Sequence, residues 1–180
     1  MTRFQIVYRA AIVALHINAR GYKRIAEIGV FKGSFFKSLM LACPGITEYV
    51  GIDTWKDLKT MDSKCTCTPM MDFDDQIWTE LYLKVLGKLK PGWSLIRADG
   101  DEAATVFPDG YFDLVFIDAE HFYEPLKKNI QTWLPKVRQG GTISGHDYTD
   151  KRHLGVKQAV DEVFGDRVNQ HSGACWIVDI

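Results

Sequence analysis

The chain has 180 residues, which is long enough to bury a sizeable core, and we expect a single domain over residues 1–180. Hydrophobic residues make up 46% of the sequence and charged residues 25%, as in ordinary soluble globular proteins. The formal net charge of −1 excludes a general attraction to nucleic acid or to an anionic membrane. Any partner must therefore be selected by a specific site.

The first segment of the chain is predicted to be a helix. Apolar side chains recur at helical spacing between residues 4 and 20. Polar residues interrupt them, and the longest apolar run, Ala10 to Leu15, is far too short to span a bilayer. We expect residues 1–22 to provide a helix that covers one edge of the sheet.

The segment from residue 24 to residue 38 predicts a strand, a turn and the start of a helix. Glu27 interrupts the apolar strand, and Gly29 and Gly33 precede the helical spacing. Turns of this kind bind anions and nucleotides. Glycine lets the backbone approach a ligand, and the helix N-terminus offers unpaired N–H groups and the positive end of its dipole.

Two common phosphate-binding fingerprints are absent from this turn. GxGxxG would need glycine where Phe31 stands, and GxxxxGK[ST] would need it at Ser34. What remains is ExGxxxG, followed by Asp53 at the end of the next predicted strand, where a carboxylate can accept hydrogen bonds from ribose hydroxyls. This combination resembles the cofactor motif of class I S-adenosylmethionine (SAM) dependent methyltransferases. The alternative is an ordinary strand–helix turn with a helpful glycine.

The resemblance implies which residues bind SAM. Asp53 would bind the ribose, the acidic turn would attract the ammonium group, and Asp99 would meet adenine in the turn after the third strand. Asp99 and Asp101 are equally typical of a turn and a helix N-cap. The implied cofactor-binding residues are Glu27, Gly29, Phe31, Gly33, Ser34, Asp53, Asp99, Gly100 and Asp118.

The segment from Thr54 to Asp75 is long, polar and irregular. A compact domain rarely carries such a loop without purpose, so we expect an active-site lid, with a plain surface insertion as the alternative. Cys65 and Cys67 lie in it, and two loop thiols are favoured over a metal or redox pair because no histidine and no second pair is nearby. The four cysteines form no disulfide framework, so a reduced cytoplasmic protein is expected.

The rest of the chain alternates strands and helices. The nearly continuous apolar run from Phe112 to Asp118 is typical of a central parallel strand that is buried on both faces. The other predicted elements are strands at Glu48–Asp53, Trp93–Arg97 and Thr142–Gly145, helices from Asp74, from Tyr123 to Pro135 and from Val156 to Phe164, and a terminal hairpin across Ser172-Gly173.

This order of elements predicts the fold class. Alternating strands and helices that end in a hairpin indicate an α/β fold. We expect a Rossmann-like, doubly wound seven-stranded sheet that is mostly parallel, with one antiparallel strand near its edge. This is the class I methyltransferase topology.

Polar side chains follow two of the predicted strands. Asp118 and His121 come after the fourth strand, and His146 and Asp147 come after the fifth. Because consecutive parallel strand ends open on the same crevice, we expect these groups to converge. Carboxylates suit Mg²⁺ or Mn²⁺, whereas two histidines with carboxylates suit Zn²⁺ or Fe²⁺. The alternative is that Asp118 caps a turn and His146 is a satisfied buried histidine.

A narrower resemblance rests on these residues. FIDAEHFYE together with GGTISGHDY resembles the small Methyltransferase-24-like family with an IDxxHxY element and a terminal HDY, related to catechol-type and macrolide-sugar O-methyltransferases. It implies a divalent metal, Mg²⁺ first, on Asp118 and Asp147 with His146, and it implies His121 as general base, with Asp118 also catalytic. Catechol-type enzymes have an asparagine ligand where this chain has Tyr148.

The implied function is SAM-dependent O-methylation of a small hydroxylated acceptor, such as a sugar, a glycosylated metabolite or a catechol-like molecule, by direct in-line transfer with or without assistance from a metal. The alternatives are a nicotinamide-dependent oxidoreductase, which the missing GxGxxG disfavours, and a SAM-binding domain without catalysis. No nucleic-acid or membrane partner is expected. A homodimer is compatible with the sequence, which does not decide the oligomeric state.

Overall fold

The computed structural model describes residues 3–56, 73–119, 121–149, 151, 153–171 and 174–180, and side chains from Arg9 onward. The strands are β1 (Arg24–Ile28), β2 (Glu48–Asp53), β3 (Trp93–Arg97), β4 (Phe112–Ile117), β5 (Val137–Gly145), β6 (Asn169–Gln170) and β7 (Trp176–Asp179). The α-helices are α1 (Arg3–Arg20), α2 (Ser34–Ala42), α3 (Asp75–Leu86), α4 (Gly100–Ala104), α5 (Tyr123–Trp133) and α6 (Leu154–Phe164), with short 3-10 turns at Leu134–Lys136 and Gly165–Arg167.

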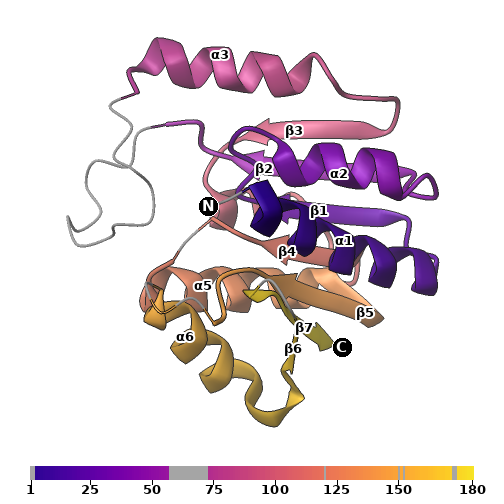
Figure 1. The fold of residues 1–180 in the computed structure, drawn as a ribbon, viewed down its shortest axis with the longest axis vertical. Helices are drawn as coiled ribbons and strands as arrows, with labels where there is room; N and C mark the ends of the chain where they lie inside the picture. Colours follow the sequence, from indigo (N-terminus) through magenta and orange to yellow (C-terminus); the bar gives the residue numbers. More distant parts are fainter. Residues whose placement is uncertain (1–2, 57–72, 120, 150, 152, 172–173) are drawn as a thin grey trace.

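The strands form one seven-stranded sheet in the order β3-β2-β1-β4-β5-β7-β6 (Figure 1). β1 pairs in parallel with β2 and β4, and the outer pairs β2–β3 and β4–β5 are also parallel. β7 runs antiparallel to both β5 and β6. The prediction of a doubly wound, mostly parallel sheet with one antiparallel strand near its edge is confirmed.

Helices cover both faces of this sheet because alternate strand residues point to opposite sides. On one face, buried residues of α1, α2 and α3 pack with Ile25, Leu114 and Phe116. On the other face, α4, α5 and α6 pack with Ala26, Val115 and other residues of opposite parity. The central strands are therefore buried on both sides, as their apolar runs predict.

Helix α1 lies over a face of the sheet rather than along one edge. Its buried Ala10, Val13, Ala14 and Ile17 belong to the same core cluster as β1 and β4. Together these apolar contacts hold the helix across the central strands, which corrects the expected edge position. The placement brings the polar residues of α1 close to the ends of those strands.

Two differences from the predicted elements have local causes. β5 begins at Val137, although the run Arg138-Gln139-Gly140-Gly141 is typical of a turn. A Cβ atom added at Gly141 would lie 2.7 Å from the carbonyl oxygen of Asp113. The glycine therefore permits close pairing of β4 and β5 at the point where their register shifts. The turn after β3 continues into the short helix α4.

Other predictions fall outside the described residues. Most of the proposed lid, including Cys65 and Cys67, lies in residues 57–72, and the turn residues Ser172 and Gly173 are likewise outside. Within the described part of the chain, every helix is too short or too polar to cross a membrane.

Candidate active site

The carboxyl edge of the sheet carries an unusual concentration of strained backbone. Four non-glycine residues in the described part of the chain have positive φ, and three of them follow directly on strand ends: Phe31 (49°) after β1, Trp55 (40°) after β2 and Asp147 (62°) after β5. This conformation costs free energy for residues with a side chain and is often found at binding and catalytic sites. The strain marks this edge as the candidate site.

The glycines of the predicted cofactor turn have separate roles. Gly29 has φ of 94°, and an added Cβ would lie 2.5 Å from the carbonyl oxygen of Asp118. Its first function is thus to let the end of β1 pack against the end of β4. Gly33, with φ of 68°, is the N-cap of α2 and lies against Val85. No side chain caps α2, which begins at Ser34. The first backbone N–H groups of this helix therefore remain available at the turn.

Asp53 fixes the backbone of this turn. Its Oδ2 accepts a hydrogen bond of 2.8 Å from the Phe31 N–H, and its Oδ1 accepts one of 2.7 Å from the Trp55 N–H. The indole of Trp55, which is fully buried, donates back to the Phe31 carbonyl at 2.9 Å. Burial raises the pKa of Asp53, although these backbone N–H groups act in the opposite direction. The backbone N–H of Val30 is a third partner, so the carboxylate retains one further acceptor site at the strand end where a ribose is expected.

Glu27 lies deeper than the sequence suggests. It is 1% exposed, and the Tyr49 hydroxyl donates to its Oε2. Burial raises the pKa of Glu27 to about 8, against the partly compensating effects of the Tyr49 hydrogen bond and of Arg9. Glu27 is therefore mostly protonated at pH 7 in this structure, and it becomes a strong counterion when a cationic group approaches.

In the candidate adenine turn, Asp99 has the alternative role that the sequence predicts, that of a helix N-cap. Asp99 is the N-cap of α4, and its Oδ1 accepts hydrogen bonds from the backbone N–H groups of Asp101 and Glu102. Asp101 instead binds the side chain of Asn129 at 2.7 Å. Ala98 donates to the Asp53 carbonyl at 3.1 Å, so this turn adjoins the ribose position. Gly100 begins α4 and packs against Ile28.

At the end of β4, the principal partner of Asp118 is a residue from the far end of the sequence. The guanidinium of Arg9, on α1, forms an ion pair with Asp118 Oδ2. Arg9 is only 7% exposed, and its Nε is buried without a hydrogen-bond partner among the described residues. Sequence reasoning missed Arg9. The one sequence feature that points to Arg9 is a basic residue next to an otherwise apolar helical stripe.

Asp147, after β5, is shared by two histidines. Its Oδ2 lies 2.8 Å from Nε2 of His121, and its Oδ1 lies 2.9 Å from Nδ1 of His146. Burial alone would raise the pKa of Asp147, but the two imidazoles outweigh it and hold this pKa well below the usual value. Burial lowers the pKa of His146, but Asp147 and Asp118 outweigh it and the net shift is upward. The structure thus brings Asp118, His121, His146 and Asp147 together, as predicted.

Two further residues, His153 and Tyr148, change this picture of the site. His153, at the N-cap of α6, lies with its ring centroid 4.5 Å from that of His121 and is 5% exposed. Sequence reasoning missed it. Tyr148 is turned away, because its hydroxyl donates to Asp161 and receives a hydrogen bond of 3.2 Å from Lys157. It does not take the place of the missing asparagine ligand.

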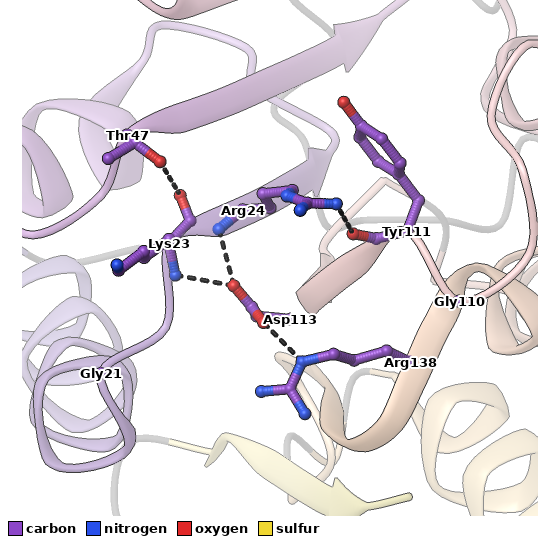
Figure 2. A pocket seen from close by; sticks show the side chains of 8 residues that line it. All are labelled: Gly21, Lys23, Arg24, Thr47, Gly110, Tyr111, Asp113 and Arg138. Atoms are coloured by element: carbon purple, nitrogen blue, oxygen red, sulfur yellow. Dashed lines mark hydrogen bonds and ion pairs between the residues drawn. The ribbon is translucent and has the colours of Figure 1, made fainter.

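A surface pocket of about 410 Å³ lies at the opposite, amino edge of the sheet (Figure 2). Asp113 closes its floor by accepting hydrogen bonds from the N–H groups of Lys23 (2.7 Å) and Arg24 (2.8 Å) and from Nε of Arg138 (2.6 Å). These contacts tie the starts of β1, β4 and β5 together. In parallel α/β sheets, ligands bind at the carboxyl edge, so we assign this pocket a structural role.

Comparisons with known proteins give the family of the chain. A family described as "Methyltransferase domain" matches residues 26–148, a stretch that runs from β1 through Asp147. The uncharacterized protein y4gI of Sinorhizobium fredii is 26% identical over 149 residues; the match covers 79% of this chain, which spans 15% of the length of that relative. This relative gives no activity.

Two solved structures share the fold. The calicheamicin methyltransferase CalS11 superimposes with a TM-score of 0.70 at 15% identity, over 99% of this chain and 80% of CalS11. The O-methyltransferase NovP superimposes with a TM-score of 0.69 at 13% identity, over 97% of this chain and 79% of NovP. The family match extends over more than half of the sequence and includes both halves of the site, so the chain belongs to the methyltransferase-domain family.

Proposed function

We propose that the protein is a SAM-dependent O-methyltransferase that acts on a small hydroxylated acceptor. The observation that carries this proposal is the pairing of His121 with Asp147 beside the strand ends that form the cofactor motif. A strained glycine turn with an acidic strand end supports SAM, and a histidine–aspartate pair beside it supports removal of a proton from an acceptor hydroxyl.

The residues on the β1–β2 side of the edge fit SAM. Asp53 keeps acceptor capacity for ribose hydroxyls, and the uncapped start of α2 keeps free N–H groups for the carboxylate of the amino acid. Glu27, which becomes a counterion when a cationic group approaches, offers negative charge for the ammonium group, and Asp99 is the proposed residue on the adenine side. When bound, SAM supplies an electrophilic sulfonium methyl group that an acceptor oxygen attacks in line.

His121 is the proposed general base. Nε2 lies 2.8 Å from Asp147, a separation at which the carboxylate accepts the Nε2–H and favours the tautomer whose basic nitrogen is Nδ1. Asp147 then stabilises the imidazolium that forms. This aspartate is held in place by its left-handed backbone and by His146 on its other oxygen. A positioned base of this kind contributes roughly 10²–10⁴-fold to rate.

The expected metal set of Asp118, His146 and Asp147 does not suit Mg²⁺. Their ligand atoms lie within 4.8 Å of one another, which meets the condition of proximity. However, the buried guanidinium of Arg9 already neutralises Asp118, and one of the three donors is an imidazole nitrogen rather than oxygen. A second cation there would be repelled by Arg9. In the proposed reaction Arg9 supplies the positive charge beside Asp118, and the proton is removed by His121 alone.

A sugar hydroxyl is the first acceptor class to test. CalS11, which has this fold, is described as a TDP-rhamnose 3′-O-methyltransferase. Among the described residues, the set of Asp118, His146 and Asp147 suits Mg²⁺ poorly, which disfavours a metal-bound catechol, whereas a neutral alcohol needs a base, which His121 provides. An oxidoreductase remains the second candidate by fold, but the turn at Phe31 has no glycine for a pyrophosphate.

The proposal is tested by methyl transfer from labelled SAM to sugars, nucleotide sugars, glycosylated metabolites and catechols, each with Mg²⁺ and with a chelator. We expect transfer to a sugar-type hydroxyl at a rate that the chelator leaves within about twofold. Transfer that is lost in chelator and restored by Mg²⁺ would contradict the metal-free mechanism. The absence of transfer to every acceptor, together with hydride exchange from a nicotinamide, would overturn the assignment itself.

A further inference from the structure

Three described residues beside the ends of β4 and β5 form a second cluster, which shares only Asp147 with the expected metal set. The ligand atoms of His121, Asp147 and His153 all lie within 4.8 Å of one another. Nε2 of His121 is 2.8 Å from Asp147 Oδ2, and the two imidazole rings are tilted by 31° with their centroids 4.5 Å apart. Asp118 and its partner Arg9 take no part in this cluster.

Backbone packing holds these three side chains together. Gly155, in the first turn of α6, lies so close to the loop before α5 that an added Cβ would be 2.7 Å from the Tyr123 nitrogen and 3.2 Å from the His121 carbonyl oxygen. This approach fixes the two segments that carry His121 and His153. Asp147 is fixed by its positive φ and by His146 at its other carboxylate oxygen, 2.9 Å away. The arrangement does not depend on flexible surface side chains.

We propose that His121, Asp147 and His153 bind one divalent transition-metal ion of the Zn²⁺ or Co²⁺ type. Two imidazoles and one carboxylate form a donor set that suits these ions and that Mg²⁺ uses poorly, because Mg²⁺ requires oxygen ligands. A zinc–nitrogen bond of about 2.0–2.1 Å and a zinc–oxygen bond of similar length place two neighbouring ligands about 3 Å apart, close to the separation of His121 and Asp147. Nδ1 of His146 lies 2.9 Å from the other oxygen of the ligating carboxylate, the position of an outer-shell partner.

A metal ion bound at this site inhibits methyl transfer, an inference that rests on the proposed function. A metal on Nε2 of His121 displaces the proton that Asp147 accepts, and the one remaining ring proton must then reside on Nδ1. No lone pair is left on the imidazole to receive the acceptor's proton. The ion and the proton-transfer role of His121 are therefore mutually exclusive.

Metal binding is measured first, without SAM or acceptor. The full chain with Cys65→Ser and Cys67→Ser serves as the parent, since those two thiols can bind zinc by themselves. Co²⁺ is followed by its visible absorption, and Zn²⁺ by competition with a chromogenic chelator. We expect one equivalent to bind the parent, with about 100-fold weaker binding in His153→Ala. His171→Ala, which removes an exposed histidine elsewhere, should match the parent.

A second variant, His153→Asn, separates loss of the ligand from loss of folding. Asparagine is a favoured helix N-cap residue, and position 153 is the N-cap of α6. It should fold as the parent does, by its circular dichroism and melting temperature, and still lose the metal. Equal affinity in the parent and in folded His153→Asn would overturn the site. Loss of binding in His171→Ala, or displacement of Co²⁺ by equimolar Mg²⁺, would overturn it equally.

The second arm compares turnover with and without Zn²⁺ inside each variant. One equivalent of Zn²⁺ should lower turnover of the parent at least tenfold and change that of His153→Asn by less than twofold. If Zn²⁺ binds as described but leaves the parent's turnover unchanged, the inhibitory role is wrong. If no acceptor is ever methylated, the proposed function fails while the binding arm still decides the metal site.

Discussion

The two halves of the carboxyl edge use their carboxylates differently. At the ends of β2 and β3, Asp53 and Asp99 accept hydrogen bonds mainly from backbone N–H groups. At the ends of β4 and β5, Asp118 and Asp147 are paired with the side chains of Arg9, His121 and His146. The first half therefore shapes the backbone of the proposed cofactor site. The second half places charges and exchangeable protons beside it.

We expect this difference to separate the residues that affect binding from those that affect chemistry. A residue that fixes backbone should affect ligand affinity and local stability, whereas a residue paired with titratable side chains should affect rate and pH dependence. Glu27 lies between the halves, because it belongs to the cofactor turn but is influenced by Arg9 and Asp118. Variants of these residues therefore test whether each half governs the property assigned to it.

The largest effect is expected for His121→Ala. Removing the proposed base should lower turnover by about 10²–10⁴-fold and leave SAM affinity within about twofold, because the residue belongs to the chemical half. Steady-state rates and calorimetry measure the two quantities on the same preparation. His171→Ala is the matched control and should retain the parent's rate. A loss of affinity with an unchanged rate would reverse the roles of the two halves.

Arg9→Met should lower the free energy of unfolding by about 3–5 kcal/mol, because it leaves the buried carboxylate of Asp118 without its counterion. Arg20→Met is the matched control on the same helix. Its ion pair with Asp179 is largely exposed and should cost less than about 1 kcal/mol. Urea denaturation gives both values. Adding Asp118→Asn to Arg9→Met should recover part of the loss, and equal losses in the two single variants would show that Arg9 is an ordinary surface cation.

Glu27→Gln tests the buried carboxyl between the halves. Burial raises the pKa of Glu27 from 4.5 to about 8, so the folded protein keeps a proton that the unfolded chain releases. This contribution is complete below pH 4.5 and is lost as pH rises towards 8. Between pH 5 and pH 8 the parent should therefore lose about 2–4 kcal/mol more stability than Glu27→Gln. Glu48→Gln, in the adjacent strand, should follow the parent, and parallel curves for parent and Glu27→Gln would refute the raised pKa.

Much of the fold could be predicted from the pattern of hydrophobic residues along the sequence. The central strand Phe112–Ile117 is nearly all apolar, and a strand of that kind is buried on both faces whatever its neighbours. The start of β5 could not be predicted. Gly140 and Gly141 are typical of a turn, and the reason for a glycine there is the close carbonyl of Asp113, which only the paired sheet supplies.

The site divides in the same way. Strand-end residues such as Asp53, Asp118 and Asp147 could be placed from the sequence because parallel strands end at a common edge. Arg9 and His153 could not. Arg9 is 109 residues from Asp118, and their contact depends on how α1 crosses the sheet. His153 approaches His121 because Gly155 allows the start of α6 to pack closely on the loop before α5, a tertiary contact that no periodic pattern predicts.

The most direct test of the central claim is calorimetry of S-adenosylhomocysteine, the product of methyl transfer, and of NAD, against the parent protein and Asp53→Ala. The parent should bind S-adenosylhomocysteine and not NAD. Asp53→Ala should weaken that binding by about 1.5–3 kcal/mol, because a charged hydrogen bond to ribose and the backbone contacts to Phe31 and Trp55 are lost together. Asp109→Ala, an exposed acid elsewhere, should bind as the parent does. Unchanged affinity in Asp53→Ala, or tighter binding of NAD than of S-adenosylhomocysteine by the parent, would contradict the claim.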